Sequence, residues 1–172
     1  MSHVLNGCTV LNNFYSRRHD RIVNRLAAEL KLSIHPKSIH INKLCESVFP
    51  DLKEELLQIV HRKPDIVVFR NGICYIVEIT VCYDTYFELS YYGKVERYGM
   101  LLSCLNRHGI EAKLLVMCFG SLGSIRSNIR NDLRVLGFDT DTVKSFLSWA
   151  SISCIIGANY IWRHRVKKIL NT

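Results

Sequence analysis

Two carboxylates and a lysine have the spacing in this sequence that points most directly to chemistry. Asp65 precedes one apolar run, Glu78 stands in the next, and Lys94 follows in a later helix-like stretch. The pair Asn71-Gly72 separates the two runs and suits a two-residue type I′ turn, because both turn positions require positive φ. Counting outward from this turn sets Asp65 opposite Glu78 on one face of a β-hairpin, with Cβ atoms about 5 Å apart.

This pairing requires a compensating cation, because two carboxylates at that distance repel each other. Mg²⁺ or Mn²⁺ fits, since these ions bind one or two carboxylates together with phosphate oxygens. Lys94 shares a helical face with Tyr91 and Tyr98, and a lysine on a core-facing stripe needs an acidic partner. The alternative is that Asp65 only starts a strand, Glu78 is solvated and the Lys94 stem reaches solvent.

Local patterns also predict the elements that position these groups, in a chain of 172 residues that suits one domain. Thr85 and Glu88 form a capping box that predicts a helix start, and this helix runs through Leu105 to a stop near Gly109. The apolar run 112–119 predicts a buried strand, and a strand–helix–strand order implies a right-handed parallel crossover. We therefore expect an α/β fold.

Further helices are predicted on both sides of this unit. Asp20 is the predicted N-cap of the first, and His19 beside it is assigned a structural hydrogen bond, with a phosphate contact as the alternative. Gly120-Ser-Leu-Gly123 predicts a tight turn, or alternatively a phosphate site at a helix N-terminus. Residues 33–50 show no clear periodicity. The predicted helices span 20–30, 51–60, 124–136, 139–156 and 159–170.

The motifs Lys63-Pro64-Asp65 and Glu78-Ile79-Thr80-Val81, with Lys94, resemble the endonuclease domain of site-specific non-LTR retrotransposon reverse-transcriptase polyproteins. Those domains carry Lys/Arg-Pro-Asp, an acidic residue followed by x-Thr-Val, and a lysine displaced to the next helix. In the wider PD-(D/E)xK nucleases a lysine stands where this sequence has Thr80. The resemblance covers nearly the whole chain and implies a restriction-endonuclease-like core, a mixed sheet with a central β-hairpin flanked by helices.

The resemblance implies a function, namely metal-dependent nicking of target DNA that primes reverse transcription. Asp65 and Glu78 would hold Mg²⁺ or Mn²⁺, and Lys94 would orient or activate water or stabilise charge on the phosphorane. Glu29 would act as an accessory acid, with a solvated side chain as the alternative. The other accessory candidates that the resemblance suggests are Lys63, Thr80 and Tyr98.

His3 and Cys8 have the spacing of the second half of a zinc knuckle, which the related polyproteins carry just before their endonuclease. Residues 1–16 would then be a knuckle remnant and lead-in, and residues 17–172 the endonuclease domain with C-terminal helices. The chain would be the C-terminal piece of a larger protein. Two ligands cannot complete a four-ligand site, so we do not expect zinc to be retained there.

The net charge of +8 favours an anionic partner. We expect DNA, and RNA of the parent element as a second partner, and no membrane, because no apolar stretch is long enough to span one. The cysteines and the lack of a signal peptide predict a reducing, intracellular compartment, and the resemblance implies the nucleus. The oligomeric state stays open. The predicted nucleic-acid contacts are His61, Arg62, Lys63, Arg126, Arg130, Arg163 and Arg165, with Arg126, Arg130 and Arg134 forming a basic stripe.

A second hypothesis belongs to a different functional class. The chain would be a catalytically silent DNA- or RNA-binding remnant that keeps the basic surface without the upstream modules that position it. The two carboxylates and Lys94 favour catalysis, whereas a start inside the knuckle favours a remnant. Nicking of a supercoiled plasmid in the presence of Mn²⁺ separates the two hypotheses.

Overall fold

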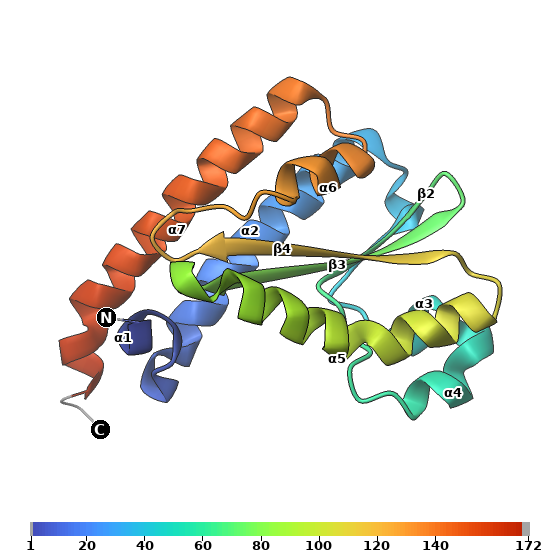
Figure 1. The fold of residues 1–172 in the computed structure, drawn as a ribbon, viewed down its shortest axis with the longest axis horizontal. Coiled ribbons are helices and arrows are strands. Elements are labelled where there is room, and N and C mark those ends of the chain that lie inside the picture. The colour runs from blue at the N-terminus through green and yellow to red at the C-terminus, as the bar shows by residue number, and fades with distance from the viewer. Residues whose placement is uncertain (1, 170–172) are drawn as a thin grey trace.

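A computed structural model describes residues 2–169, with side chains described for 4–165, and shows a mixed α/β fold built on one sheet (Figure 1). The sheet has four strands in the order β1-β2-β3-β4. Strand β2 is antiparallel to both of its neighbours, β1 and β3, and β4 is parallel to β3. The strands are β1 (Ile39–Ile41), β2 (Ile66–Arg70), β3 (Ile73–Cys82) and β4 (Ala112–Gly120).

The hairpin register follows the Asn71-Gly72 turn and confirms the predicted pairing. Asn71 has φ 50° and Gly72 has φ 79°, so both turn residues lie in the left-handed region that a type I′ turn requires. Arg70 pairs with Ile73, and the pairs continue outward to Ile66 opposite Val77. One further step along each strand sets Asp65 opposite Glu78.

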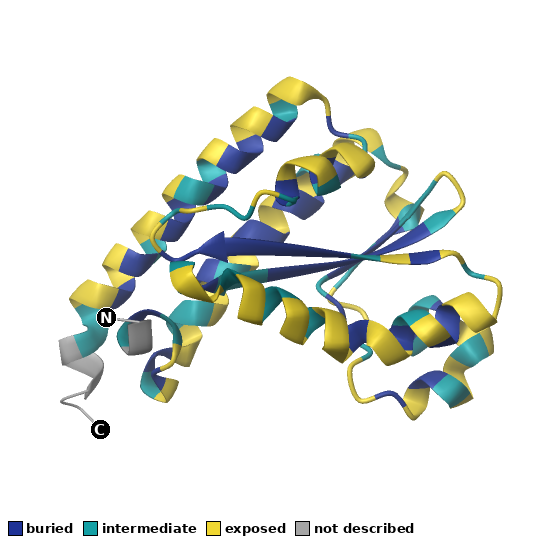
Figure 2. Ribbon diagram, viewed as in Figure 1, coloured by how far each residue is buried: buried dark blue, intermediate teal, exposed yellow. Residues whose placement is uncertain are grey.

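Helices cover both faces of the sheet, so the central strands are buried through most of their length (Figure 2). On one face lie α2 (Asn12–Ser33), α6 (Ile129–Val135) and α7 (Thr140–Ile169), whose apolar residues form one core with the sheet. On the other face lie α3 (Cys45–Val48), α4 (Lys53–Leu57) and α5 (Phe87–Arg107). The remaining helical segments are α1 (Ser2–Asn6) and the 3₁₀ turns Thr9–Leu11, Pro36–Ser38, Pro50–Leu52 and Asp84–Tyr86.

Several predicted boundaries are wrong. Helix α2 begins at Asn12 rather than at Asp20, so Asp20 lies inside the helix. The two predicted C-terminal helices are one helix, α7, and Gly157 does not break it. A Cβ at position 157 would lie 2.8 Å from Cδ of Arg18, so this glycine lets α2 and α7 pack closely.

The loops around β4 also correct the sequence interpretation. Thr85 lies in the 3₁₀ turn that precedes α5 rather than capping it, and Glu88 instead pairs with Arg126. The tight turn after β4 is confirmed, whereas the helix predicted from residue 124 begins only at Ile129. The Asp84 carboxylate accepts hydrogen bonds from the backbone N–H groups of residues 122 and 124, at 3.0 and 3.3 Å. The backbone N–H groups of this turn, which the sequence suggested could bind a phosphate, are therefore bound to the Asp84 carboxylate instead.

All seven cysteines are unpaired and buried, including the four that stand in apolar runs of the sequence, Cys74, Cys82, Cys104 and Cys118. Among the described residues, no helix combines the length and the apolar character needed to cross a bilayer.

Candidate active site

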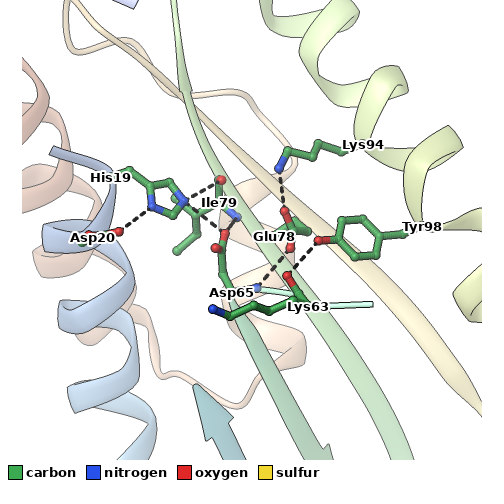
Figure 3. Close-up of polar contacts among 8 residues, drawn as sticks. All are labelled: His19, Asp20, Lys63, Asp65, Glu78, Ile79, Lys94 and Tyr98. Carbon is green, nitrogen blue, oxygen red and sulfur yellow. Dashed lines mark hydrogen bonds and ion pairs between the residues drawn. The ribbon is translucent and has the colours of Figure 1, made fainter. Parts of the chain in front are cut away.

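The end of the hairpin brings Asp65 and Glu78 together through the backbone (Figure 3). The Asp65 N–H donates to Oε1 of Glu78 at 3.0 Å, and the Ile79 N–H donates to Oδ2 of Asp65 at 2.8 Å. Pairing with β2 ends at Val77, whereas β3 continues to Cys82, so the Ile79 N–H takes a side-chain acceptor in place of a strand partner. The Glu78 carboxylate is thus held by the backbone of Asp65, just before β2, and the Asp65 carboxylate is held by the backbone of β3.

Helix α5 supplies a cation to the second carboxylate. The Lys94 ammonium lies 2.7 Å from Oε2 of Glu78, as the helical spacing predicted. Glu78 is only 2% exposed. Burial first, and then the charge of Asp65, raise the pKa of Glu78, while Lys94 opposes the rise. A buried carboxylate beside a second carboxylate is a feature of functional sites.

Tyr98 lies one helical turn beyond Lys94 and is also buried. Its hydroxyl donates to the backbone carbonyl of Lys63 at 3.3 Å. Burial and the neighbouring Glu78 carboxylate raise the pKa of the Tyr98 phenol, so it stays protonated and can act as a donor. Tyr98 therefore holds the segment before Asp65 against α5.

His19 joins the site from α2, on the opposite side of β3 from Lys94 (Figure 3). Its Nε2 lies 3.1 Å from Oδ2 of Asp65 and 3.1 Å from the carbonyl oxygen of Ile79. Nδ1 lies 3.0 Å from Oδ1 of Asp20. Burial lowers the pKa of His19, but the two carboxylates outweigh burial and raise it to about 9. His19 is therefore an imidazolium at neutral pH.

Sequence reasoning gave His19 a structural hydrogen bond and missed its contact with Asp65. The two residues are 46 positions apart in the chain, and no local pattern connects them. The available signal was the pair His19-Asp20 itself, since a carboxylate beside a histidine favours its charged form. Each carboxylate thus has a cationic partner: His19 of α2 for Asp65, and Lys94 of α5 for Glu78.

The accessory candidates separate into two groups. Thr80 lines an open hollow beside the carboxylates, together with His19 and Lys94. Lys63 contributes its carbonyl to Tyr98, and its side chain is exposed. Glu29 is not part of this cluster, because it pairs with Arg25 at 2.5 Å and lines a different hollow.

Several predicted nucleic-acid contacts are engaged within the protein. Arg62 pairs with Glu46 at 3.0 Å. Arg126 pairs with Glu88 at 3.0 Å, and its guanidinium carbon lies 3.8 Å from the centre of the Tyr91 ring. The basic stripe is not one helical row, because Arg126 precedes α6 whereas Arg130 and Arg134 lie on it.

The remaining basic candidates lie at the surface. His61, Lys63, Arg130 and Arg163 are exposed, and Arg163 donates to Asn159 at 3.1 Å. Arg165 stacks on Trp162, with 3.5 Å between the guanidinium carbon and the ring centre. The exposed members are the ones available to a phosphate backbone.

Of the candidate zinc half-site, only Cys8 has a described side chain. Cys8 is buried in a small apolar cluster with Leu11 and Ile161. The His3 side chain lies outside the described residues. The structure therefore gives no geometry for this pair as metal ligands.

The donor set beside Asp65 fits a hard divalent cation. Oδ2 of Asp65 and the carbonyl oxygen of Ile79 converge on one point, since both lie 3.1 Å from the same His19 nitrogen. Carboxylate and carbonyl oxygens are the ligands that Mg²⁺ and Mn²⁺ prefer. No protein-family model matches the chain, and no curated protein matches it.

Proposed function

We propose that this chain is a divalent-metal-dependent endodeoxyribonuclease domain, similar to that of non-LTR retrotransposon polyproteins. One observation carries the proposal: Asp65, Glu78 and Lys94, which the motif resemblance singles out, converge from three elements into one hydrogen-bonded cluster. The antiparallel β2–β3 hairpin followed by the parallel β3–α5–β4 unit supports a restriction-endonuclease-like core. In this proposal the enzyme nicks target DNA in the nucleus and so primes reverse transcription.

The residues have distinct roles in this proposal. Asp65 and the Ile79 carbonyl would hold Mg²⁺ or Mn²⁺, with Glu78 beside them. A bound ion of this kind lowers the pKa of a water molecule and neutralises phosphate charge. Glu78 positions the ammonium of Lys94, a residue that lines the hollow, and this charge would stabilise negative charge on the phosphate.

His19 has a role that follows from its place between two oxygens. Its imidazolium lies against Asp65 and Ile79 and balances the Asp65 charge when no other cation is bound. The ring has to leave this position, or lose the Nε2 proton, before these oxygens can bind an ion. His19 thereby keeps the carboxylate pair stable in the metal-free protein.

The test is nicking of a supercoiled plasmid by the purified chain in Mn²⁺ or Mg²⁺. The wild-type protein should convert supercoiled to open-circular DNA, and chelation of the metal should stop the reaction. Asp65→Ala and Glu78→Ala should abolish nicking while their far-UV circular dichroism matches the wild type. Full activity in both variants would exclude this pair as the nuclease centre.

A catalytically silent nucleic-acid-binding remnant is the second candidate. The exposed basic side chains and the net charge of +8 favour it. It predicts that the chain binds DNA and leaves plasmid intact at every Mn²⁺ concentration. Binding without metal-dependent nicking would establish it in place of the nuclease.

A further inference from the structure

A second cluster of metal-ligating side chains lies at the other end of α5, away from the carboxylate pair. It consists of Glu55 from α4 and of Cys104 and His108 near the C-terminal end of α5. One potential ligand atom from each residue lies within 4.8 Å of the other two. Cys104 and His108 are four residues apart, a spacing that places both on one face of a helix.

The three groups approach from different depths. Cys104 is 1% exposed, so its thiol lies at the floor of the cluster. The Glu55 and His108 side chains are 37% and 42% exposed, and both line an open hollow. The cluster thus has a closed inner side formed by sulfur and an outer side open to solvent.

The Glu55 and His108 side chains touch each other and would have to separate slightly to admit an ion. Nε2 of His108 lies 2.7 Å from Oε2 of Glu55, and the Arg107 guanidinium contacts the other Glu55 oxygen. In a tetrahedral site with Zn–N and Zn–O bonds near 2.0 Å, these two ligand atoms would be about 3.3 Å apart. Half-exposed side chains can make this small separation by rotation, without movement of either helix.

We propose that Glu55, Cys104 and His108 form a zinc site with three protein ligands and a fourth position open to water. Thiolate, imidazole and carboxylate together suit Zn²⁺, whereas Mg²⁺ requires oxygen ligands in octahedral geometry. The thiol proton and any Nε2 proton go to solvent as the ion binds. The site is independent of the proposed nuclease centre and exists whether or not the chain cuts DNA.

Zinc bound here would fasten α4 to the end of α5. Helix α4 is only five residues long and follows a 3₁₀ turn, so it has little stability of its own. A ligand that binds only the folded state raises the apparent stability of the protein. Arg107 competes with the ion for Glu55, so Arg107→Gln should tighten metal binding.

The experiment is a titration of the metal-free protein with Co²⁺, a spectroscopic substitute for Zn²⁺. Coordination by a cysteine thiolate produces an intense near-ultraviolet charge-transfer band, which an ion bound only by oxygen and nitrogen lacks. The wild type should develop this band, and added Zn²⁺ should remove it. Cys104→Ser should abolish the band, and Glu55→Gln and His108→Ala should weaken Co²⁺ binding by about tenfold or more.

Cys8→Ser is the matched control, because Cys8 is a buried cysteine that belongs to the knuckle-like pair. This variant should keep the band. Circular dichroism checks that each variant is folded, and the surface variants Glu55→Gln and His108→Ala test the site if Cys104→Ser does not fold. The proposal is wrong if the folded wild type shows no band, if Cys104→Ser keeps it, if Cys8→Ser loses it, or if both surface variants bind Co²⁺ as the wild type does.

Discussion

Near each end of helix α5, basic side chains contact a glutamate, and the pKa values of these two glutamates are shifted in opposite directions. Near the start of the helix, Lys94 meets Glu78, which is 2% exposed and whose pKa is raised by burial and by Asp65. Near the end, His108 and Arg107 meet Glu55, whose side chain is 37% exposed. The hydrogen bond to His108 first, and then the Arg107 charge, hold the pKa of Glu55 below its ordinary value.

The difference shows how burial changes the effect of an ion pair on a carboxylate. At the exposed end the carboxylate gains partners and loses little hydration, so its charge is favoured. At the buried end Lys94 does not compensate for lost hydration and for a second carboxylate, so the charge remains costly. Stability alone does not explain the buried arrangement, whereas the cation binding that we propose for this site would explain it.

The largest expected effect is at the buried carboxylates. Asp65→Asn and Glu78→Gln keep the shape of the side chains and remove charge, so nicking should fall by about 10²-fold or more. Mn²⁺ should raise the thermal midpoint of the wild type and not that of Asp65→Asn, because the variant lacks the carboxylate that would hold the ion together with the Ile79 carbonyl. Plasmid nicking and thermal denaturation with and without Mn²⁺ measure both effects.

The matched control for the carboxylates is Glu111→Gln. Glu111 is an exposed glutamate, and its ion pair with Lys113 lies at the surface. The Glu111→Gln variant should therefore nick plasmid at the wild-type rate. A Mn²⁺-induced shift that survives in Asp65→Asn would place the ion elsewhere.

The next effect is at Lys94. Lys94→Met keeps an unbranched apolar stem and removes the charge, so the protein should fold while nicking drops by about two orders of magnitude. Lys113→Met, at the exposed pair with Glu111, should have no effect on the rate. Equal rates for Lys94→Met and the wild type would remove Lys94 from the mechanism and leave it as a partner of Glu78.

DNA affinity should depend on the exposed charges and not on the buried ones. Because each neutralised phosphate releases counterions, affinity should fall steeply with salt, and unrelated duplexes should bind within a few-fold of each other. Lys63→Gln and Arg130→Gln should each make the logarithmic salt slope shallower by about 0.9, the value for one phosphate contact. Arg126→Gln should change the slope less, since Arg126 is already paired with Glu88.

Binding titrations on several duplexes at two salt concentrations measure this prediction. Strong preference for one duplex that persists at high salt would show a sequence-reading surface in this chain. That result would contradict binding through phosphate contacts alone.

The smallest expected effect is a pH-dependent stability from His19. Its pKa is raised from 6.5 to about 9 in the folded protein, so its contribution is complete below pH 6.5 and is lost as pH rises through 9. The wild type should exceed His19→Gln in free energy of unfolding at pH 6, and the difference should shrink by pH 9.5. Urea unfolding at both pH values measures this difference in free energy. His61→Gln, at an exposed position, is the control. A difference that does not change with pH would mean that the imidazolium does not stabilise the fold.

The hairpin, its register and the α5 surface that carries Lys94 all follow from local patterns in the sequence. An Asn-Gly turn fixes which residues pair, and strand alternation then assigns Asp65 and Glu78 to their places. Helical periodicity likewise placed Lys94 and Tyr98 on the face that meets the sheet. These features are local, because a few dihedral angles and the periods of strand and helix fix them.

Contacts between residues far apart in the chain depend on how the helices pack on the sheet and on one another. His19 reaches Asp65 because α2 packs across the sheet, and Glu55 reaches Cys104 and His108 because α4 packs on α5. The edge strand β1 pairs with β2 although residues 33–50 show no clear periodicity, and Arg18 of α2 packs against α7 at Gly157. Contacts of this kind depend on how helices pack over a sheet, which is a property of many residues at once and leaves no periodic signal in any one segment of the chain.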